Sequence, residues 1–315
     1  MLKDRGENSI RKGGWSGVKV KLIVNPRAGN GLGLKRGTEV AREIEKRGIG
    51  ISTSFTSRFR EENATSLAKN AVQQGTDRIV VVGGDGTINE VANGIAGSGV
   101  PLGIIPAGVG NDFARALGIP EGAKKALNVA VGDKVIEVDL GRVNGRYFTS
   151  MVSFGFDACV NRRALELKRK YWFLPPEGMY VIALLGKLLS RLEYFPVEID
   201  VPGTTSLLGK KLLIAVANVT RYGRILKIAP EANERDGLLD ICLIREAGRL
   251  RIVTNIPRII QGTHINLPEV EMLRVPSLTI RSSKNLPCQM DGEVLPGKQE
   301  YQISTFQGAL KVLVP

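Results

Sequence analysis

Residues 78–90, RIVVVGGDGTINE, decide the fold class of this chain. The apolar run at 78–82 is typical of a strand buried in a parallel sheet, and a helical pattern begins at about Ile88. The turn between them gathers unpaired backbone N–H groups at a helix start, where anions bind. Glycines let a phosphate approach this backbone without a clash with Cβ atoms. The stretch therefore predicts a phosphate site at Gly83, Gly84 and Gly86.

Asp85 is out of place in a simple phosphate cradle, because its carboxylate repels an anion. A Mg²⁺ ion between the carboxylate and the phosphate, bound directly or through water, would explain the residue. The alternative is an ordinary tight turn in which Thr87 caps the following helix. We favour the phosphate site because a buried strand, a GGDG turn and a helix start occur together.

The first 140 residues alternate between strand and helix patterns. Strands are expected at 18–24, 78–82 and 102–105, and helices at 33–46, at 64–72, from about Ile88 and from near Asn111. Such alternation predicts βαβ units with a parallel sheet. Two further polar turns follow strands, NPRAGNG at 25–31 and PAGVGNDFAR at 106–115. Because ligands bind beyond the carboxyl ends of parallel strands, the three turns are expected to line one cleft, which adds Gly108, Asn111 and Asp112 to the candidate site.

From residue 135 the pattern changes to strands separated by Pro and Gly. One helical interruption is expected, at 160–190. The expected strands are 135–140, 146–153, 197–201, 211–217, 238–244, 271–275 and 277–281. This pattern predicts a second, mainly β domain.

Composition limits the class of protein. The chain has 315 residues, 43% of them hydrophobic, which suits two domains. Three widely spaced cysteines and the single His264 exclude a disulfide scaffold, a cysteine-based zinc site and a multi-histidine metal site. No apolar segment reaches the roughly 20 residues that cross a bilayer, and the first residues lack the apolar stretch of a signal peptide. We therefore expect a cytoplasmic protein with a flexible tail at 1–17.

The net charge of +13 indicates an anionic partner. Residues 142–191 carry nine basic and three acidic residues, and Trp172 and Phe173 lie between the cations at 162–170 and an apolar run that reaches Leu189. This composition is typical of a segment on a membrane surface, so 160–190 is a candidate for peripheral contact with the inner membrane face. The alternative is a helix packed on its own domain. No nucleic-acid partner is expected, because no zinc-knuckle, recognition-helix or RNP pattern occurs.

Six motifs resemble the diacylglycerol kinase catalytic family, which includes bacterial soluble lipid kinases and sphingosine kinases. GGDGT alone is shared with NAD kinases and is related to a phosphofructokinase motif, whereas its combination with NDFAR and DGE is far more specific. The motifs follow the order of that family: NPRAGNG at 25–31, GGDGTINE at 83–90, PAGVGNDFAR at 106–115, FGFDA at 154–158, APEANERDGLLDI at 229–241 and QMDGE at 289–293.

The resemblance implies two domains with the active site in the cleft between them. The first, at 18–140 plus about 295–315, would be an α/β nucleotide-binding domain like that of NAD kinases and phosphofructokinases. The second, at 141–294, would be a mainly β, sandwich-like domain that holds the lipid acceptor.

The resemblance also implies roles for individual residues. ATP would be held by Asn25, Pro26, Arg27, Ala28, Gly29, Thr56 and residues 84–90, which include Thr87, Asn89 and Glu90. A network of water and Mg²⁺ would include Asp85, Asp112, Asp139, Asp291 and Glu293. A structural Mg²⁺ would be held by Asp236 and the backbone carbonyl of Leu238. Two positions depart from the family pattern: Val109 replaces a usual Thr, and Tyr222-Gly223-Arg224 replaces a usual glycine run.

The sequence therefore predicts a Mg²⁺-dependent lipid kinase that transfers the γ-phosphate of ATP, with diacylglycerol as the expected acceptor and phosphatidic acid as the product. We assign the acceptance of the hydroxyl proton to the turn at 291–293, with Glu293 as the first candidate. One alternative is a related kinase that acts on another lipid, a sphingoid base or NAD. A non-catalytic nucleotide- or lipid-binding regulator is another, and a homodimer is left open.

Overall fold

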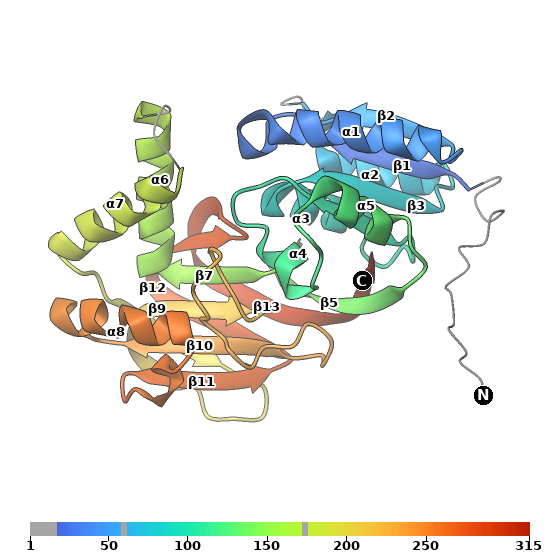
Figure 1. Ribbon diagram of the computed structural model, residues 1–315. Coiled ribbons are helices and arrows are strands. Elements are labelled where there is room, and N and C mark those ends of the chain that lie inside the picture. Colours follow the sequence, from blue (N-terminus) through green and yellow to red (C-terminus); the bar gives the residue numbers. More distant parts are fainter. Residues whose placement is uncertain (1–17, 58–61, 172–175) are drawn as a thin grey trace, which may run out of the picture.

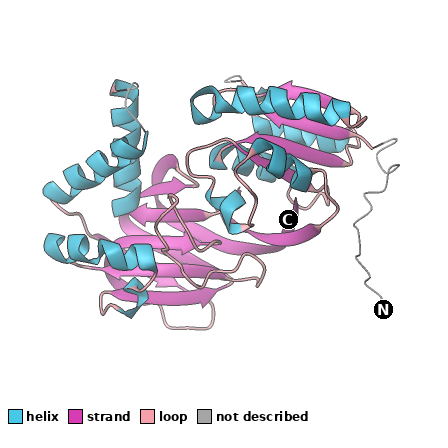
Figure 2. Cartoon of the chain, in the orientation of Figure 1, coloured by secondary structure: helices cyan, strands magenta, loops and turns pink. Residues whose placement is uncertain are grey.

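The computed structural model describes residues 18–57, 62–171 and 176–315. The tail expected at 1–17 and the aromatic residues Trp172 and Phe173 lie outside the described residues. The described chain forms an α/β half and a mainly β half (Figure 1, Figure 2), which confirms the predicted fold class. Within these ranges no helix combines the length and the apolar character needed to cross a membrane.

The first half is a parallel sheet with helices packed on it. Its strands lie in the order β2, β1, β3, β4. The strand β3 is buried from Ile79 to Gly83, since it lies between β1 and β4 beneath the helices. The bounds are β1 Val20–Val24, α1 Leu32–Lys46, β2 Ile51–Phe55, α2 Ala64–Gln73, β3 Arg78–Gly83, α3 Asp85–Ile95, β4 Leu102–Pro106, α4 Asp112–Ala116 and α5 Ala123–Ala130.

Helix α3 begins three residues earlier than predicted. Its N-cap is Gly84, which makes no side-chain capping hydrogen bond, and Asp85 stands in the first turn. Thr87 lies inside the helix, where its Oγ1 accepts a 2.8 Å hydrogen bond from Asn25 Nδ2. The alternative of a turn capped by Thr87 is therefore wrong. A carboxylate in the first turn also suits the positive end of the helix dipole.

The second half is a mainly antiparallel sheet with three longer helices. The helical interruption expected at 160–190 is observed as α6 and α7. The single strand expected at 146–153 is two strands, β6 and β7, with a break at residues 149–150, and the strand expected at 277–281 continues to Met290. The elements are β5 Val135–Val143, β6 Arg146–Phe148, β7 Met151–Gly155, α6 Phe156–Lys170, α7 Pro176–Leu189, β8 Phe195–Asp200, β9 Leu207–Ala217, β10 Leu239–Arg245, α8 Arg249–Gln261, β11 Val270–Val275, β12 Ser277–Met290 and β13 Glu293–Leu313.

The 21-residue strand β13 joins the two halves into one sheet. It pairs with β12 and β5, and its Val312 lies opposite Leu102 of β4. Tyr301 belongs to the core of the β half, whereas Leu310 and Val312 belong to the core of the α/β half. A single strand thus holds the two halves of the molecule in register.

The sequence patterns missed four elements, β2, α5, β13 and α8. Strand β2 is short and polar, and it lies at the edge of the sheet, where burial imposes no apolar run. Strand β13 is interrupted by Gly297 and Gly308, which imitate turns. Helix α8 contains Pro257, which indicates a helix break in sequence, and none of its residues is buried.

Candidate active site

The glycine-rich turns lie together at the carboxyl edge of the parallel sheet. Ala107 N donates a 2.7 Å hydrogen bond to Gly83 O. A Cβ atom on Gly84 would lie 2.9 Å from Gly108 Cα, and a Cβ atom on Gly29 would lie 2.3 Å from Ala107 O. Because no side chain fits between these turns, they present a surface made of backbone, as a phosphate site requires.

The remaining residues predicted to hold ATP lie around the same edge. Asn111, at φ +52°, closes its own turn, since its Oδ1 accepts from Gly108 N at 2.8 Å. Thr56 follows β2, and its N–H donates to Val24 O at 2.8 Å. Asn25 Oδ1 accepts a 3.0 Å hydrogen bond from Arg27 N, and the exposed Arg27 stands beside the half-buried Pro26 and Ala28.

The half-buried Asp85 lies near two other carboxylates. Its Oδ1 accepts a 3.3 Å hydrogen bond from Phe113 N. Burial, followed by the negative charges of Asp112 and Asp291, raises its pKa to about 7. A cation would favour the ionised form, so Asp85 fits a Mg²⁺ ligand whose other ligands are water and phosphate oxygens. Among the residues that the structure describes, no three acidic, histidine or cysteine side chains surround a common metal position.

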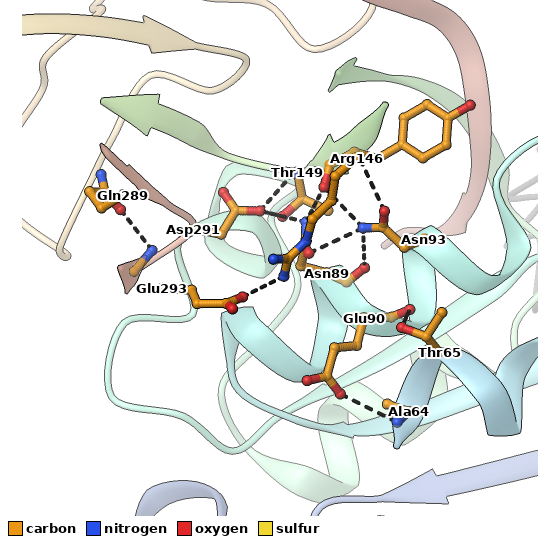
Figure 3. Close-up of polar contacts among 12 residues, drawn as sticks. Ala64, Thr65, Asn89, Glu90, Asn93, Arg146, Thr149, Gln289, Asp291 and Glu293 are labelled. Carbon is orange, nitrogen blue, oxygen red and sulfur yellow. Dashed lines mark hydrogen bonds and ion pairs between the residues drawn. The ribbon is translucent and has the colours of Figure 1, made fainter. Parts of the chain in front are cut away.

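Asp291 is a fully bonded structural carboxylate. Its Oδ2 accepts from Asn89 Nδ2 at 2.8 Å and from Thr149 N and Oγ1 at 2.7 and 2.9 Å. Its Oδ1 accepts from Ser150 N and Met151 N, both at 2.9 Å. Figure 3 shows the bonds to Asn89 and Thr149. With five donors on two oxygens, Asp291 has no lone pair left for direct contact with a metal ion.

Glu293 is the more accessible carboxylate of the same turn. It is half-exposed and forms an ion pair with Arg146 (Figure 3). Glu90 lies near this pair, and burial raises its pKa, although Ala64 N donates to it at 3.3 Å. Glu293 is therefore accessible to a ligand, and Arg146 holds its carboxylate through the ion pair.

Asp112 bonds across the two halves, in addition to its 3.6 Å ion pair with Arg115 of the same segment. Its Oδ2 accepts from Gly223 N at 2.6 Å, and its Oδ1 accepts from Arg224 N at 2.9 Å. Both donors belong to the hairpin at 222–226, which replaces the usual glycine run. Arg224 adopts φ +75°, a conformation that glycine prefers, and its guanidinium donates to Val109 O at 3.3 Å. Val109 and Arg224, which both depart from the family pattern, are therefore in direct contact.

Asp139 belongs to a different set of contacts. Its Oδ2 accepts from Gly237 N at 2.7 Å and its Oδ1 from Gly308 N at 2.8 Å, so it ties the loop before β10 to β13. In that loop, Asp236 Oδ1 accepts from Leu238 N at 3.0 Å, and Asp236 Oδ2 is paired with Arg274. Arg274 therefore already places a positive charge on Asp236, where the resemblance implies a structural Mg²⁺.

An apolar cavity of about 140 Å³ lies between α7, α8 and the β half. Its wall includes Leu184 of α7, Ile256 of α8 and Ala215 of β9, together with the buried polar groups of Asp157 and Tyr180. Sequence reasoning missed this cavity because α8 was not recognised and because its wall comes from distant segments. A cavity with an apolar wall and a few polar groups suits a hydrocarbon chain.

Asp157 connects the cavity to the turn that carries Glu293. It accepts hydrogen bonds from Ser153 Oγ at 2.6 Å, Tyr180 OH at 2.7 Å and Gln289 Nε2 at 3.1 Å. Gln289 Oε1 in turn accepts from Gly292 N at 2.9 Å (Figure 3). The FGFDA motif was noted in the sequence, but the role of its Asp157 depends on partners that only the fold brings near.

Comparisons with known proteins agree with this architecture. Residues 19–143 match the diacylglycerol kinase catalytic domain, and residues 150–314 match the YegS C-terminal NAD kinase beta sandwich-like domain. The chain is 33% identical to a diacylglycerol kinase of Mycobacterium tuberculosis over 312 residues, which cover 94% of this chain and 95% of the relative. It is 31% identical to a diacylglycerol kinase of Bacillus subtilis, with 89% and 92% covered.

Solved structures show the same fold. A diacylglycerol kinase from Bacillus anthracis superposes with a TM-score of 0.76 at 27% identity, over 94% of this chain and 97% of that one. An NAD kinase from Archaeoglobus fulgidus in complex with ATP superposes with a TM-score of 0.52 at 13% identity, over 94% and 93% of the two chains. The second likeness concerns the fold alone.

Proposed function

The chain belongs to the diacylglycerol kinase catalytic family, and from this premise we propose that it transfers the γ-phosphate of ATP to a lipid hydroxyl. Diacylglycerol is the acceptor that the names of its relatives support, with phosphatidic acid as the product. The reaction needs a phosphate cradle, neutralisation of phosphate charge and a group that accepts the hydroxyl proton.

The backbone turns at Gly29, Gly84 and Gly108 supply the phosphate cradle in this proposal. Asp85 would hold the Mg²⁺, which when bound neutralises charge on the phosphates. Asp112 and Asp291 act differently from Asp85, because backbone N–H groups already occupy their oxygens. They keep the nucleotide turns and the acceptor half in fixed positions.

Glu293 is the proposed acceptor of the hydroxyl proton. It lies on the turn that Asp291 anchors, and it is exposed, whereas the two oxygens of Asp291 already accept five hydrogen bonds. Arg146 orients its carboxylate through the ion pair. In this proposal the two carboxylates of the turn have different roles: Asp291 positions the turn, and Glu293 accepts the proton.

The observation that carries the lipid assignment is the hydrogen-bond path from the apolar cavity to this turn. Asp157 lines the cavity, and Gln289 links Asp157 to Gly292, the residue beside Glu293. A hydrocarbon chain in the cavity would therefore place its polar end near the reactive turn. A water-soluble acceptor such as NAD offers no apolar chain for this cavity.

A membrane surface next to the cavity would give access to such a lipid. Helices α6, α7 and α8 lie at one end of the β half (Figure 1). Helix α6 carries exposed cations from Arg162 to Lys170. The exposed apolar residues are Val181, Ile182, Leu185 and Leu189 of α7 and Leu250, Val253 and Ile260 of α8. We therefore extend the predicted contact at 160–190 to α8, and place the reaction on the inner membrane face.

Transfer of labelled phosphate from ATP to a panel of acceptors tests the function. The panel contains diacylglycerol, monoacylglycerol, a sphingoid base and NAD. Labelled phosphatidic acid as the main product supports the proposal. Transfer to another acceptor identifies a different kinase, and no transfer to any acceptor, with ATP binding retained, identifies a regulator.

A cavity variant tests the lipid pocket directly. Ile256→Trp fills the cavity from α8, so the KM for diacylglycerol should rise while the KM for ATP stays the same. Leu208→Trp is the control, since Leu208 of β9 is 72% exposed and lies outside both the cavity and the proposed membrane surface. Equal kinetics for both variants would show that the cavity does not hold the acceptor.

A further inference from the structure

Arg274 bridges two carboxylates beside the loop that precedes β10. Asp236 lies in this loop, Asp240 in β10 and Arg274 in β11, directly opposite Asp240 in the antiparallel register. The guanidinium pairs with Asp236 Oδ2, and its Nε lies 3.4 Å from Asp240 Oδ1. One side chain of the chain itself therefore stands where the resemblance implies a divalent cation.

The carboxylates around Arg274 require a positive charge. Asp240 is 2% exposed, and its Oδ2 has no hydrogen-bond partner among the described residues. The negative charges of Asp236 and Glu231 act on it in addition. A buried carboxylate without a cation is strongly destabilising. Because Arg274 contacts two of these carboxylates, it supplies the charge that the loop needs.

We propose that Arg274 replaces a structural divalent cation at Asp236 and Asp240, so that the loop at 229–238 is fixed without metal. A guanidinium suits this position, because it stays charged at all relevant pH values and its planar donors can reach two carboxylates at once. Mg²⁺ would need several free oxygen ligands in octahedral order. While Arg274 pairs with both Asp236 and Asp240, its guanidinium takes the position beside these oxygens that a cation would need.

Thermal unfolding without nucleotide, in EDTA and in increasing Mg²⁺ or Ca²⁺, tests the proposal without reference to activity. The Tm of the wild-type protein should not respond to the divalent ion. Arg274→Gln should lower the Tm by several degrees in EDTA, and the ions should restore it saturably, because two carboxylates are then free to bind them. The double variant Arg274→Gln with Asp240→Asn should lose this response, which separates the site from Asp85.

Arg245→Gln is the matched control. Arg245 forms an exposed ion pair with Glu271 across the same two strands, without a second carboxylate, so its loss should create no response to divalent ions. A wild-type Tm that rises with Mg²⁺, and that loses this rise on Asp236→Asn, would overturn the proposal. So would an Arg274→Gln protein that ignores divalent ions. If the Arg274→Gln variant is unfolded in EDTA, the yield of folded protein is measured with and without Ca²⁺ instead of the Tm. A yield that Ca²⁺ does not increase would overturn the proposal.

Discussion

Asp291 accepts a 2.8 Å hydrogen bond from the side chain of Asn89, 202 residues earlier in the chain. Asn89 lies on the helix that follows the phosphate turn, whereas Asp291 lies on the turn that carries Glu293. Asn89 Nδ2 also donates to Tyr147 O at 2.9 Å. The side chain of Asn89 therefore links the proposed nucleotide site to the turn that carries Glu293. Substitution of Asn89 or Asp291 should loosen this link.

Asp291→Asn should lower the free energy of unfolding, because Asp291 has a structural role that does not depend on Mg²⁺. An amide offers one oxygen where the carboxylate accepts five hydrogen bonds, so buried N–H donors lose their acceptor. We expect the free energy of unfolding to fall by about 2–4 kcal/mol, measured by urea denaturation followed by circular dichroism. Glu293→Gln, two residues away and half-exposed, is the control and should change it little. Equal stability of both variants would contradict the structural role.

Glu293→Gln should lower turnover by about 100-fold or more while leaving the affinity for ATP unchanged, because it removes only the proton acceptor. Initial rates at saturating ATP and lipid measure this. Arg146→Gln keeps the carboxylate and loses its partner, so its loss should be smaller, and Arg146→Lys should recover part of it. Wild-type turnover in the Glu293 variant would assign the proton to another group.

Asp85→Asn should remain folded yet lose about 100-fold or more in turnover at saturating Mg²⁺. Its stability should equal or exceed that of the wild type, since Asp112 and Asp291 repel the carboxylate. Turnover across a Mg²⁺ series, with thermal unfolding as the check on folding, decides the matter. A variant that regains full activity at high Mg²⁺ would show that Asp85 only tunes metal affinity.

Leu250→Asp should weaken binding to anionic vesicles by about 10-fold or more, since a buried leucine contributes about 1.5–3 kcal/mol. Leu250 is 78% exposed on α8. Sedimentation with vesicles that contain phosphatidylglycerol measures the binding, which should also fall with salt as the cations of α6 are screened. Leu208→Asp is the control, because Leu208 is 72% exposed on β9, outside this surface. Equal losses for both variants would exclude α8 as the contact.

The pH dependence of stability should reveal Asp157. Burial raises its pKa above the ordinary 3.8, so the folded protein keeps a proton that the unfolded chain releases. Stability from this group is present below pH 3.8 and is lost as pH rises towards the folded pKa. Asp157→Asn cannot ionise, so its free energy of unfolding should improve relative to wild type across this window.

Asp200→Asn is the control with the opposite sign, because a hydrogen bond from Ser206 and then Arg281 lower the pKa of Asp200. The wild type gains stability relative to that variant as pH rises towards 3.8. Urea denaturation between pH 3 and 7 would measure both differences. A difference between wild type and Asp157→Asn that stays constant with pH would show that folding does not shift the pKa of Asp157.

Elements whose residues are contiguous in the chain could be predicted from the sequence. Buried β3, the glycine turn and the helix that follows all lie within residues 78–95, so their signal is contiguous. The contacts of Asp291 and Asp139 were not predictable in this way, because their donors lie up to 202 residues away and are mostly backbone N–H groups. A carboxylate in a Gly-rich turn looks the same in sequence whether it meets a metal ion or a ring of amides.

Residues of the cavity were missed for a related reason. Asp157 and Gln289 are buried polar residues whose partners come from three separate elements. Periodicity detects apolar faces, but it does not detect a polar network inside them. The proline at 257 hid α8, and with it one wall of the cavity.

Strand β13 has a consequence for biosynthesis. During translation, β4 leaves the ribosome long before residues 293–313, so its outer edge stays unpaired until Val312 arrives opposite Leu102. An unpaired strand edge invites pairing with other chains, and such distant partners find each other slowly. A nascent chain interrupted before residue 293 would therefore lack a strand in both halves of the molecule. Neither half would be complete, and the truncated chain would depend on chaperones to stay dispersed.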